Sequence, residues 1–362
     1  MVAKDQIKRT AEGKGVKWDA HVKALQATSE VSSALLFATQ YSAVCPAYAS
    51  MAVVPGFTVC AVLWGNHARC TTVVLLLYLY WDTCSMPHLF HTLLCCPAAQ
   101  LHAIKEELEN KDVVYPEYYF KPFHAYDQGN LNWLAAYEVE PATYSVALRT
   151  FGKIDPTLTP EKAYARLAGG ATDALISYCQ KHGLPTAARN IVDVGCSVGM
   201  STRWLASQFP DSQIMGLDLS PYFISVAEWE ERKRGFTGAS RRVRYVHDRV
   251  ETSKQLSPAS VDWMLFQYVI HECPQHAIRD FIATSARALK PNGVLFFVDN
   301  NPRSKTMQSL PPAIAILLKS TEPWSDEYFS FDVEAAMRQG GFKEVVTVEI
   351  DHRHRAVMGI KA

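Results

Sequence analysis

The sequence predicts an α/β fold built on an open, mostly parallel sheet. From residue 190 onward, short runs rich in β-branched residues alternate with longer segments of helical period, as in strands connected by helices. The first run, at 191–194, leads into a turn bounded by Gly195 and Gly199 and then into a helix. Acidic residues end or follow the next two runs. Ligands of open α/β sheets bind at the carboxyl ends of the strands, so a ligand site is predicted there.

The elements expected after the glycine turn follow one another at short intervals. Strands are predicted at 213–218, 243–247, 261–266 and 294–298, and helices at 223–234, 274–289 and 331–339. Ser220 and Pro221 are a typical helix start, because serine caps the first turn and proline suits the first helical position. Residues 290–293, Lys-Pro-Asn-Gly, predict a turn. The runs at 342–350 and 355–360 are expected to close the sheet as an antiparallel hairpin.

A helical and aromatic extension is expected at 101–185, ahead of the sheet domain at 186–362. Helices are predicted at 133–151 and 160–182 from their apolar period. An aromatic stretch, 115–127, precedes the first of these helices. It could pack against the sheet, or it could form a lid that excludes water from a bound cofactor. In the second case Tyr126 and Asp127 are expected nearest the cofactor.

Residues 31–100 form an apolar, cysteine-rich block that differs from the polar, partly helical segment at 1–30. Arg69 and Asp82 are its only Asp, Glu, Lys or Arg residues, and it holds six of the nine cysteines. A bilayer-spanning helix needs about 20 apolar residues, which 43–65 could supply despite two prolines. Alternatively the block packs in a core, or it is a retained intron, since its excision joins 27–30 to 101–109 as one amphipathic helix. Sequencing the mature transcript tests the intron interpretation, which a message that always contains the block would refute.

The charge of the chain favours no charged macromolecular partner. The 36 basic and 36 acidic residues balance, so no net field attracts nucleic acid or an anionic membrane. A basic cluster at 232–244 is partly offset by Glu230 and Glu231 and is interpreted as a solvated loop. The first residues lack a secretory pattern, because charges precede any apolar run. Cys179, Cys196 and Cys273 are isolated, so no metal site is predicted and free thiols are expected in a reducing compartment.

The glycine turn is compatible with three kinds of site. As a dinucleotide motif, G-x-G-x-x-G, it has Ser197 and Met200 in place of two glycines. As the G-x-S-x-G elbow of a hydrolase it offers Ser197 as nucleophile, with Asp299 and His352 following in the required order. The third pattern runs from Asp193 to Gly199 and resembles the first motif of class I S-adenosylmethionine-dependent methyltransferases, with Ser197 at the middle glycine.

The acidic residues fit a nucleoside ligand. Asp218 ends the second strand, where a carboxylate can accept two hydrogen bonds from ribose hydroxyls. Asp248 follows the third strand and could accept from an adenine amino group or merely cap a loop, with Glu251 as a rival for the adenine role. Gly195 and Gly199 would let the backbone approach the amino-acid tail of S-adenosylmethionine, whose ammonium Asp193 would bind directly or through water. Cys196, Leu219 and Gln267 complete the expected cofactor contacts.

The resemblance to class I methyltransferases extends over about residues 101–362. It includes the motifs at 193–199, 216–221, 261–266 and 289–294, in the family's order, and is nearest to the branch containing quinone and sterol biosynthesis enzymes. A closer similarity, to an uncharacterised plastid-associated group, is carried by the motifs at 120–126, 271–274 and 319–324. Two residues depart from the family pattern: Ser197, and Trp263, where a smaller residue is common. The resemblance implies the class I Rossmann-like sheet, S-adenosylmethionine as cofactor and a chloroplast location, against membrane-associated or cytoplasmic alternatives.

The function that the resemblance implies is methyl transfer to a small molecule. His271 is the catalytic candidate, as base or substrate-orienting group, although it could instead cap the next helix; His124 is a second candidate. Residues 319–331 are expected to cover the acceptor, where Trp324, Tyr328 and Phe329 would suit an apolar or aromatic molecule unless they fill the core. The alternatives are a non-catalytic cofactor-binding or regulatory protein, an α/β-hydrolase using Ser197, and an NAD(P)-dependent reductase. The oligomeric state is left open.

Overall fold

The computed structural model describes residues 2–26, 52–54, 57–59, 97–152, 154–235 and 241–362. Its contacts divide the chain into two compact units, Met1–Lys23 with Ile104–Ala362, and Ala24–Ala103. In the smaller unit, β1 (Ala52–Val54) and β2 (Phe57–Val59) pair antiparallel. No helix among the described residues is both long and apolar enough to span a bilayer. Most of the block at 31–100, with its membrane and intron interpretations, lies outside the described residues.

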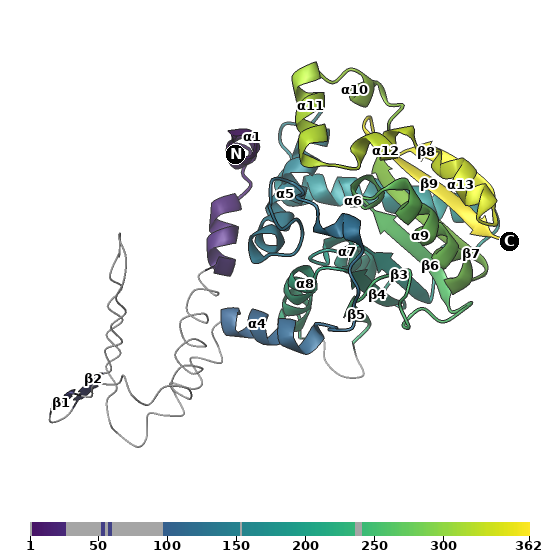
Figure 1. Ribbon diagram of the computed structural model, residues 1–362. Coiled ribbons are helices and arrows are strands. Elements are labelled where there is room, and N and C mark those ends of the chain that lie inside the picture. The colour runs from purple at the N-terminus through teal and green to yellow at the C-terminus, as the bar shows by residue number, and fades with distance from the viewer. Residues whose placement is uncertain (1, 27–51, 55–56, 60–96, 153, 236–240) are drawn as a thin grey trace. The chain divides into compact units, whose positions relative to one another are not determined.

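A seven-stranded sheet organises the larger unit (Figure 1). Its strand order is β5-β4-β3-β6-β7-β9-β8, and the first five of these strands run parallel. The chain begins the sheet at its centre, with β3 (Asn190–Val194), and then adds β4 (Gln213–Asp218) and β5 (Val243–His247) on one side. On the other side it adds β6 (Val261–Gln267), β7 (Leu289–Asn300) and an antiparallel hairpin of β8 (Phe342–Glu349) and β9 (His354–Lys361). The predicted fold class, with its closing hairpin, is confirmed.

Helices cover both faces of this sheet. Successive side chains of the central strands point to opposite faces, and both sets are apolar, so each face is buried under a layer of helices. Val192 and Met264 point toward α9 (Gln275–Ala288) and α13 (Val333–Gln339). Ile191 and Trp263 point toward α6 (Pro160–Lys181) and α7 (Met200–Gln208). Trp263 is buried and meets Phe209 edge to face, with ring centroids 5.2 Å apart. The bulky residue at this position is therefore a core residue.

The predicted bounds are close to those observed, with three differences. The turn predicted at 290–293 belongs to β7, where Asn292 has a φ of 62° and interrupts the pairing with β6. The segment before α13 forms three helices that the sequence pattern did not reveal, α10 (Lys305–Gln308), α11 (Pro312–Thr321) and α12 (Ser325–Ser330). The N-terminal segment, expected to be partly helical, contains α1 (Val2–Glu12) and, among the described residues, a second helix over 18–26.

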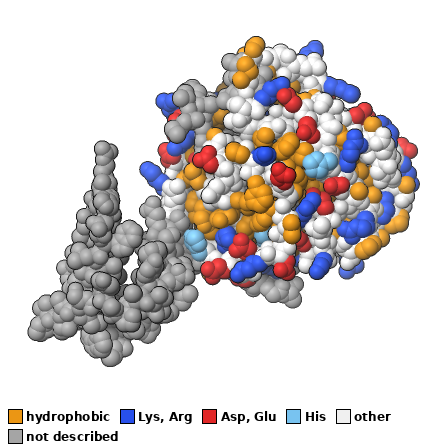
Figure 2. Space-filling model, in the orientation of Figure 1, with side chains coloured by type: hydrophobic (Ala, Val, Ile, Leu, Met, Phe, Trp, Pro, Cys, Tyr) orange, Lys and Arg blue, Asp and Glu red, His pale blue; other side chains and the backbone are white. Residues whose placement is uncertain are grey.

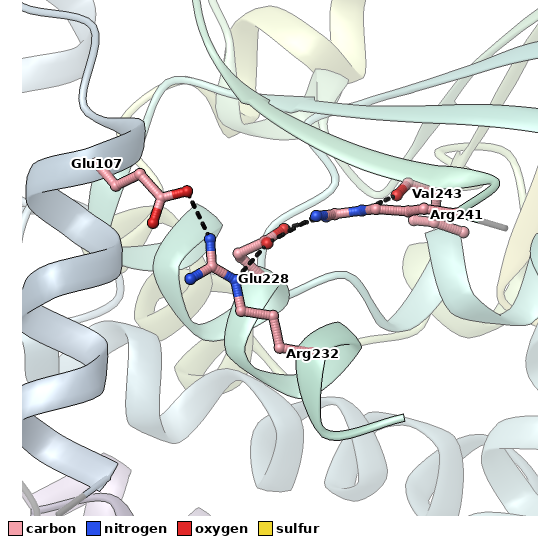
Figure 3. A network of polar contacts seen from close by, with 5 residues as sticks. All are labelled: Glu107, Glu228, Arg232, Arg241 and Val243. Atoms are coloured by element: carbon pink, nitrogen blue, oxygen red, sulfur yellow. Dashed lines mark hydrogen bonds and ion pairs between the residues drawn. The ribbon is translucent and has the colours of Figure 1, made fainter. Parts of the chain in front are cut away.

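The helical extension comprises α4 (Pro97–Leu108), the 3₁₀ turn η1 (Glu117–Phe120), α5 (Trp133–Phe151) and α6. A polar network ties the end of α4 to α8 (Pro221–Lys233) and β5 (Figure 3). Its centre is the buried Glu228, whose carboxylate accepts from Arg232 Nε at 2.7 Å and from Arg241, while Arg232 also donates to Glu107 at 2.7 Å. Two arginines surround this carboxylate, so its pKa is held below the usual range despite burial.

Charges of both signs are interspersed over the face shown in Figure 2, and hydrophobic side chains gather toward its centre. Among the described residues, the largest exposed fractions of bulky apolar side chains are those of Val114, at 75%, and Ile316, at 67%. No single sign of charge dominates the visible face. This agrees with the balanced composition.

Candidate active site

A cavity of about 640 Å³ lies at the carboxyl ends of β3, β4 and β6. This is the point where the strand order reverses, because β4 and β6 lie on opposite sides of β3. The cavity wall contains most of the cofactor and catalytic candidates named from the sequence: Gly195, Cys196, Asp218, Leu219, Asp248, Gln267 and His271. Asp193 and Gly199 are not among the residues that line it. A volume of this size is within the usual range for a small-ligand site.

The glycine turn takes its shape from close packing. Gly195 and Gly199 have φ values of 67° and 77°, in the left-handed region that favours glycine. A Cβ at Gly195 would lie 2.5 Å from a methyl of Val269, and one at Gly199 would overlap the Tyr245 hydroxyl. Both positions therefore exclude larger residues, and the turn leaves its backbone open toward the cavity.

Ser197, the departure from the family motif, also has a left-handed backbone, with a φ of 51°. For a non-glycine residue this conformation costs energy and persists only when neighbouring contacts hold it. The Ser197 N–H donates to Asp218 Oδ2 at 2.8 Å, which links the turn to the end of β4. A serine is thus accommodated where the family pattern has glycine.

Asp218 is held firmly at the cavity wall. Its Oδ1 accepts from the Ser220 N–H at 2.8 Å, while Oδ2 accepts from Ser197. The residue is only 7% exposed, and burial raises the pKa of its carboxyl to about 7. Each carboxylate oxygen keeps a further lone pair. The ionised group can therefore accept two more hydrogen bonds from a ligand in the cavity, as ribose hydroxyls require.

Asp193 has a different place. Its Oδ2 accepts from the hydroxyls of Ser201 and Thr202, each at 2.7 Å, and Gln267 Nε2 lies 3.4 Å from Oδ1. The carboxylate therefore fixes the first turn of α7 below the glycine turn. Burial raises its pKa, and these three hydrogen bonds oppose the rise.

Asp248 caps its own loop and also borders the cavity. Its Oδ1 accepts from the Arg249 N–H at 2.8 Å and its Oδ2 from the Ser253 hydroxyl at 2.7 Å. Glu251, the rival for the adenine contact, borders the same space and pairs with Arg249 at 3.1 Å. The structure therefore brings both acids to one end of the cavity.

The aromatic stretch packs over the cavity instead of extending away from it. Tyr118, Tyr119, Phe123 and Tyr126 line the space, whereas Asp127 is exposed. Tyr126 donates its hydroxyl proton to Glu138 on α5. The start of the stretch is held by His247, a residue not singled out from the sequence: its Nε2 lies 3.0 Å from the Tyr115 hydroxyl, and its Nδ1 accepts from the Asn110 N–H at 2.9 Å. The stretch therefore covers the cavity and is fastened to the sheet.

His271 lies in the 3₁₀ turn η3 (Ile270–Glu272) after β6, and it pairs with Asp299 at the end of β7. Its Nδ1 is 2.8 Å from Asp299 Oδ1, and its backbone N–H donates to Oδ2 at 3.1 Å. Although burial opposes protonation, Asp299 raises the pKa of His271 to about 10. An imidazolium cannot accept a proton, so this geometry favours the orienting role over the base. His271 does not cap α9, because Glu327 accepts from the first N–H of that helix, at Gln275.

The segment expected to cover the acceptor contributes less aromatic surface to the cavity than the sequence suggested. Trp324 lines the cavity, but Tyr328 is fully buried and donates to the Asn300 carbonyl, and Phe329 packs against the core. The cavity wall there also contains Arg149 and Arg353, which the sequence did not identify. Burial, together with the positive charge of Arg353, lowers the pKa of Arg149 to about 10. One arginine lies on a helix and the other in a hairpin loop, and no sequence motif indicates that the two come together at one site.

The hydrolase interpretation fails on geometry. Its three members would have to be Ser197, Asp299 and His352, but Asp299 is paired with His271. His352 is exposed in the loop between β8 and β9. The catalytic constellation is therefore not assembled, and Ser197 serves the turn instead.

Comparisons with known proteins agree with this geometry. Residues 192–297 match the family described as "Methyltransferase domain". A ubiquinone biosynthesis O-methyltransferase of Methylococcus capsulatus is 28% identical over 145 residues, which are 40% of this chain and 57% of that protein. A trans-aconitate 2-methyltransferase of Mycobacterium ulcerans is 31% identical over 90 residues, 25% of this chain and 29% of that protein. The chain thus matches less than two thirds of the length of either relative.

Solved structures with similar coordinates include phosphoethanolamine N-methyltransferase 2 of Haemonchus contortus in complex with S-adenosyl-L-methionine. It is 15% identical, the match covers 52% of each chain, and the TM-score is 0.41. The match over 192–297 spans β3 to β7 in part, and so includes the glycine turn and the acid at the end of β4. Residues 192–297 are thus similar to methyltransferase domains, in a chain whose sheet order and glycine turn are those expected for such a domain.

Proposed function

We propose that the protein transfers a methyl group from S-adenosylmethionine to a small-molecule acceptor. One observation carries the proposal: the Asp218 carboxylate is fixed by two backbone N–H groups at the wall of a covered cavity, beside a turn whose glycines leave no room for side chains. This arrangement suits the ribose and the amino-acid tail of the cofactor at once. The domain match over 192–297 supports the same activity.

The residues around the cavity suggest how each part of the cofactor would be held. Asp218 would accept from the ribose hydroxyls, and Asp248 or Glu251 would accept from the adenine amino group. The cofactor's sulfonium already activates its methyl group, so the protein needs mainly to position the acceptor and exclude water. Aromatic rings of Tyr119 and Tyr126 cover the cavity and would favour a cationic sulfur.

The acceptor end of the cavity supports a molecule with an apolar or aromatic body and an anionic group. Trp324 and Tyr118 supply apolar surface, and their rings meet edge to face at 6.5 Å. Arg149 and Arg353 border the same space, and guanidinium groups bind carboxylate or phosphate in paired hydrogen bonds. One matched relative is named for trans-aconitate, a carboxylate acceptor. A plastid location is proposed on the motif resemblance alone, and tagging the full chain in plant cells tests it.

The test is a titration of the full chain with S-adenosylmethionine, followed by a screen of anionic aromatic and aliphatic metabolites for methyl uptake. The expected result is saturable binding and turnover of at least one acceptor. Asp218→Ala should weaken binding, whereas Asp211→Ala, which changes an exposed aspartate, should not. Binding without turnover across the screen would favour the non-catalytic alternative. Failure to bind the cofactor would reject the proposal.

A further inference from the structure

We propose that His124, His271 and Glu322 form a binding site for a divalent transition-metal ion at the acceptor end of the cavity. One ligand atom from each of these side chains lies within 4.8 Å of the others. His124 Nε2 and Glu322 Oε1 are 3.8 Å apart. Donors bound to one ion at about 2.0–2.2 Å each lie about 3–4 Å from one another, so a small closing movement completes the site. The sequence does not predict this site, because the three residues are far apart in the chain and form no metal-binding motif.

Three separate segments of the chain converge to build this cluster. His124 comes from the aromatic stretch, His271 from η3, and Glu322 from the segment that joins α11 to α12. All three line the cavity. Two imidazoles with one carboxylate are a donor set suited to ions such as Mn²⁺, Fe²⁺, Co²⁺ and Zn²⁺, and less suited to Mg²⁺ or Ca²⁺, which prefer oxygen.

Asp299 supplies the support that metal-binding histidines usually have. Its Oδ1 lies 2.8 Å from His271 Nδ1, so the Nδ1 proton can stay with Asp299 while an ion takes the place of the proton on Nε2, which is released to solvent. Asp299 is itself held, because it accepts from the backbone N–H groups of His271 at 3.1 Å and Asn300 at 2.7 Å. A carboxylate on the second nitrogen fixes the ring orientation and strengthens the histidine as a ligand.

His124 is held in an unfavourable backbone conformation. His124 and the following Ala125 have φ values of 50° and 64°, in the left-handed region. The His124 N–H donates to the Thr321 carbonyl at 2.9 Å, which places His124 beside Glu322. The Phe123 ring packs against the imidazole at 3.9 Å between centroids. Backbone strain that neighbouring contacts maintain is typical of ligand-binding sites.

Three protein ligands would leave coordination positions open toward the cavity. An oxygen of the acceptor could fill one of them, so that the ion and the arginines together orient an anionic acceptor. This last step rests on the proposed methyl transfer, whereas metal binding itself does not. The competing explanation is a plain network of ion pairs, His124 with Glu322 and His271 with Asp299, that binds no ion.

The test is a titration of the full chain with Co²⁺, followed by its visible absorption, and with Zn²⁺ by calorimetry. We expect one ion per chain with nitrogen and oxygen ligation. Glu322→Gln and His124→Ala should abolish the Co²⁺ spectrum. Asp299→Asn, which keeps an acceptor oxygen, should weaken metal binding about 10–100-fold. The matched controls Glu117→Gln and His352→Ala change exposed residues outside the cluster and should bind the ion as the wild type does.

Three outcomes would overturn the proposal: no Co²⁺ binding, binding that survives Glu322→Gln, or a charge-transfer band that shows thiolate ligands from cysteine. S-adenosylmethionine binding is measured on the same proteins. A chain that binds the cofactor but not Co²⁺ rejects only the metal site, and a chain that binds Co²⁺ but not the cofactor rejects only the proposed function.

Discussion

Replacing Asp218 by alanine is the most direct perturbation of the cofactor site. The substitution removes a carboxylate that accepts from two backbone N–H groups and that can accept two more bonds from a ribose. A hydrogen bond to a charged group is worth about 1.5–3 kcal/mol. At about 1.4 kcal/mol per tenfold change, losing one such bond weakens binding about 10–150-fold, and losing both weakens it further.

The same substitution also affects stability. The N–H groups of Ser197 and Ser220 lose their acceptor, and an unpaired buried donor costs about 1–3 kcal/mol. The assay is therefore calorimetric titration with S-adenosylmethionine at a temperature where circular dichroism shows the variant folded, with Asp211→Ala as the control. A folded Asp218→Ala protein with wild-type affinity would refute the assignment of the ribose to this carboxylate.

Four further predictions follow from the site and its surroundings. S-adenosylmethionine affinity should rise between about pH 6 and pH 8, because the pKa of Asp218 is about 7 and only the ionised form accepts two ribose bonds; a flat profile would contradict this. Without ligand, the Asp218 contribution to the free energy of unfolding should fall with rising pH, because the pKa of this carboxyl is higher in the folded than in the unfolded protein. The groups that face it are Ser197, Ser220, Glu272 and Asp193. Comparing the unfolding of wild type and Asp218→Asn at pH 5 and pH 8 measures the difference. His271→Ala should reduce kcat far more than cofactor affinity, and equal losses in both would assign it to cofactor binding. Gly199→Ala should lower Tm and cofactor affinity together, because the new Cβ meets Tyr245 and the backbone at this position is left-handed. The control is Gly183→Ala: Gly183 also has a left-handed backbone, but a Cβ there meets no other atom, so this variant measures the backbone cost alone.

The sequence by itself determined the fold class, most strands and helices of the sheet domain and the closing hairpin. The signals that mark these elements are local: short apolar runs rich in β-branched residues for the strands, and helix caps and apolar period for the helices. The limits of α5, β4 and β5 coincide with those predicted because apolar period and turn residues mark both ends. Trp263 also followed the strand pattern, since its ring is buried and packs edge to face on Phe209.

Tertiary structure alone decided the chemistry at the acceptor end. From its place after a strand, His271 could be a base or an orienting group, but only the approach of β7 brings Asp299 to its Nδ1 and raises its pKa. Tyr328 looked like an acceptor contact and proved to be core, because the turn of α12 directs it toward Asn300. The meeting of His124 with Glu322 could not be predicted, since side chains nearly two hundred residues apart become neighbours only through the path of the whole chain. Local patterns encode strands and turns, whereas contacts between distant loops depend on how the elements pack.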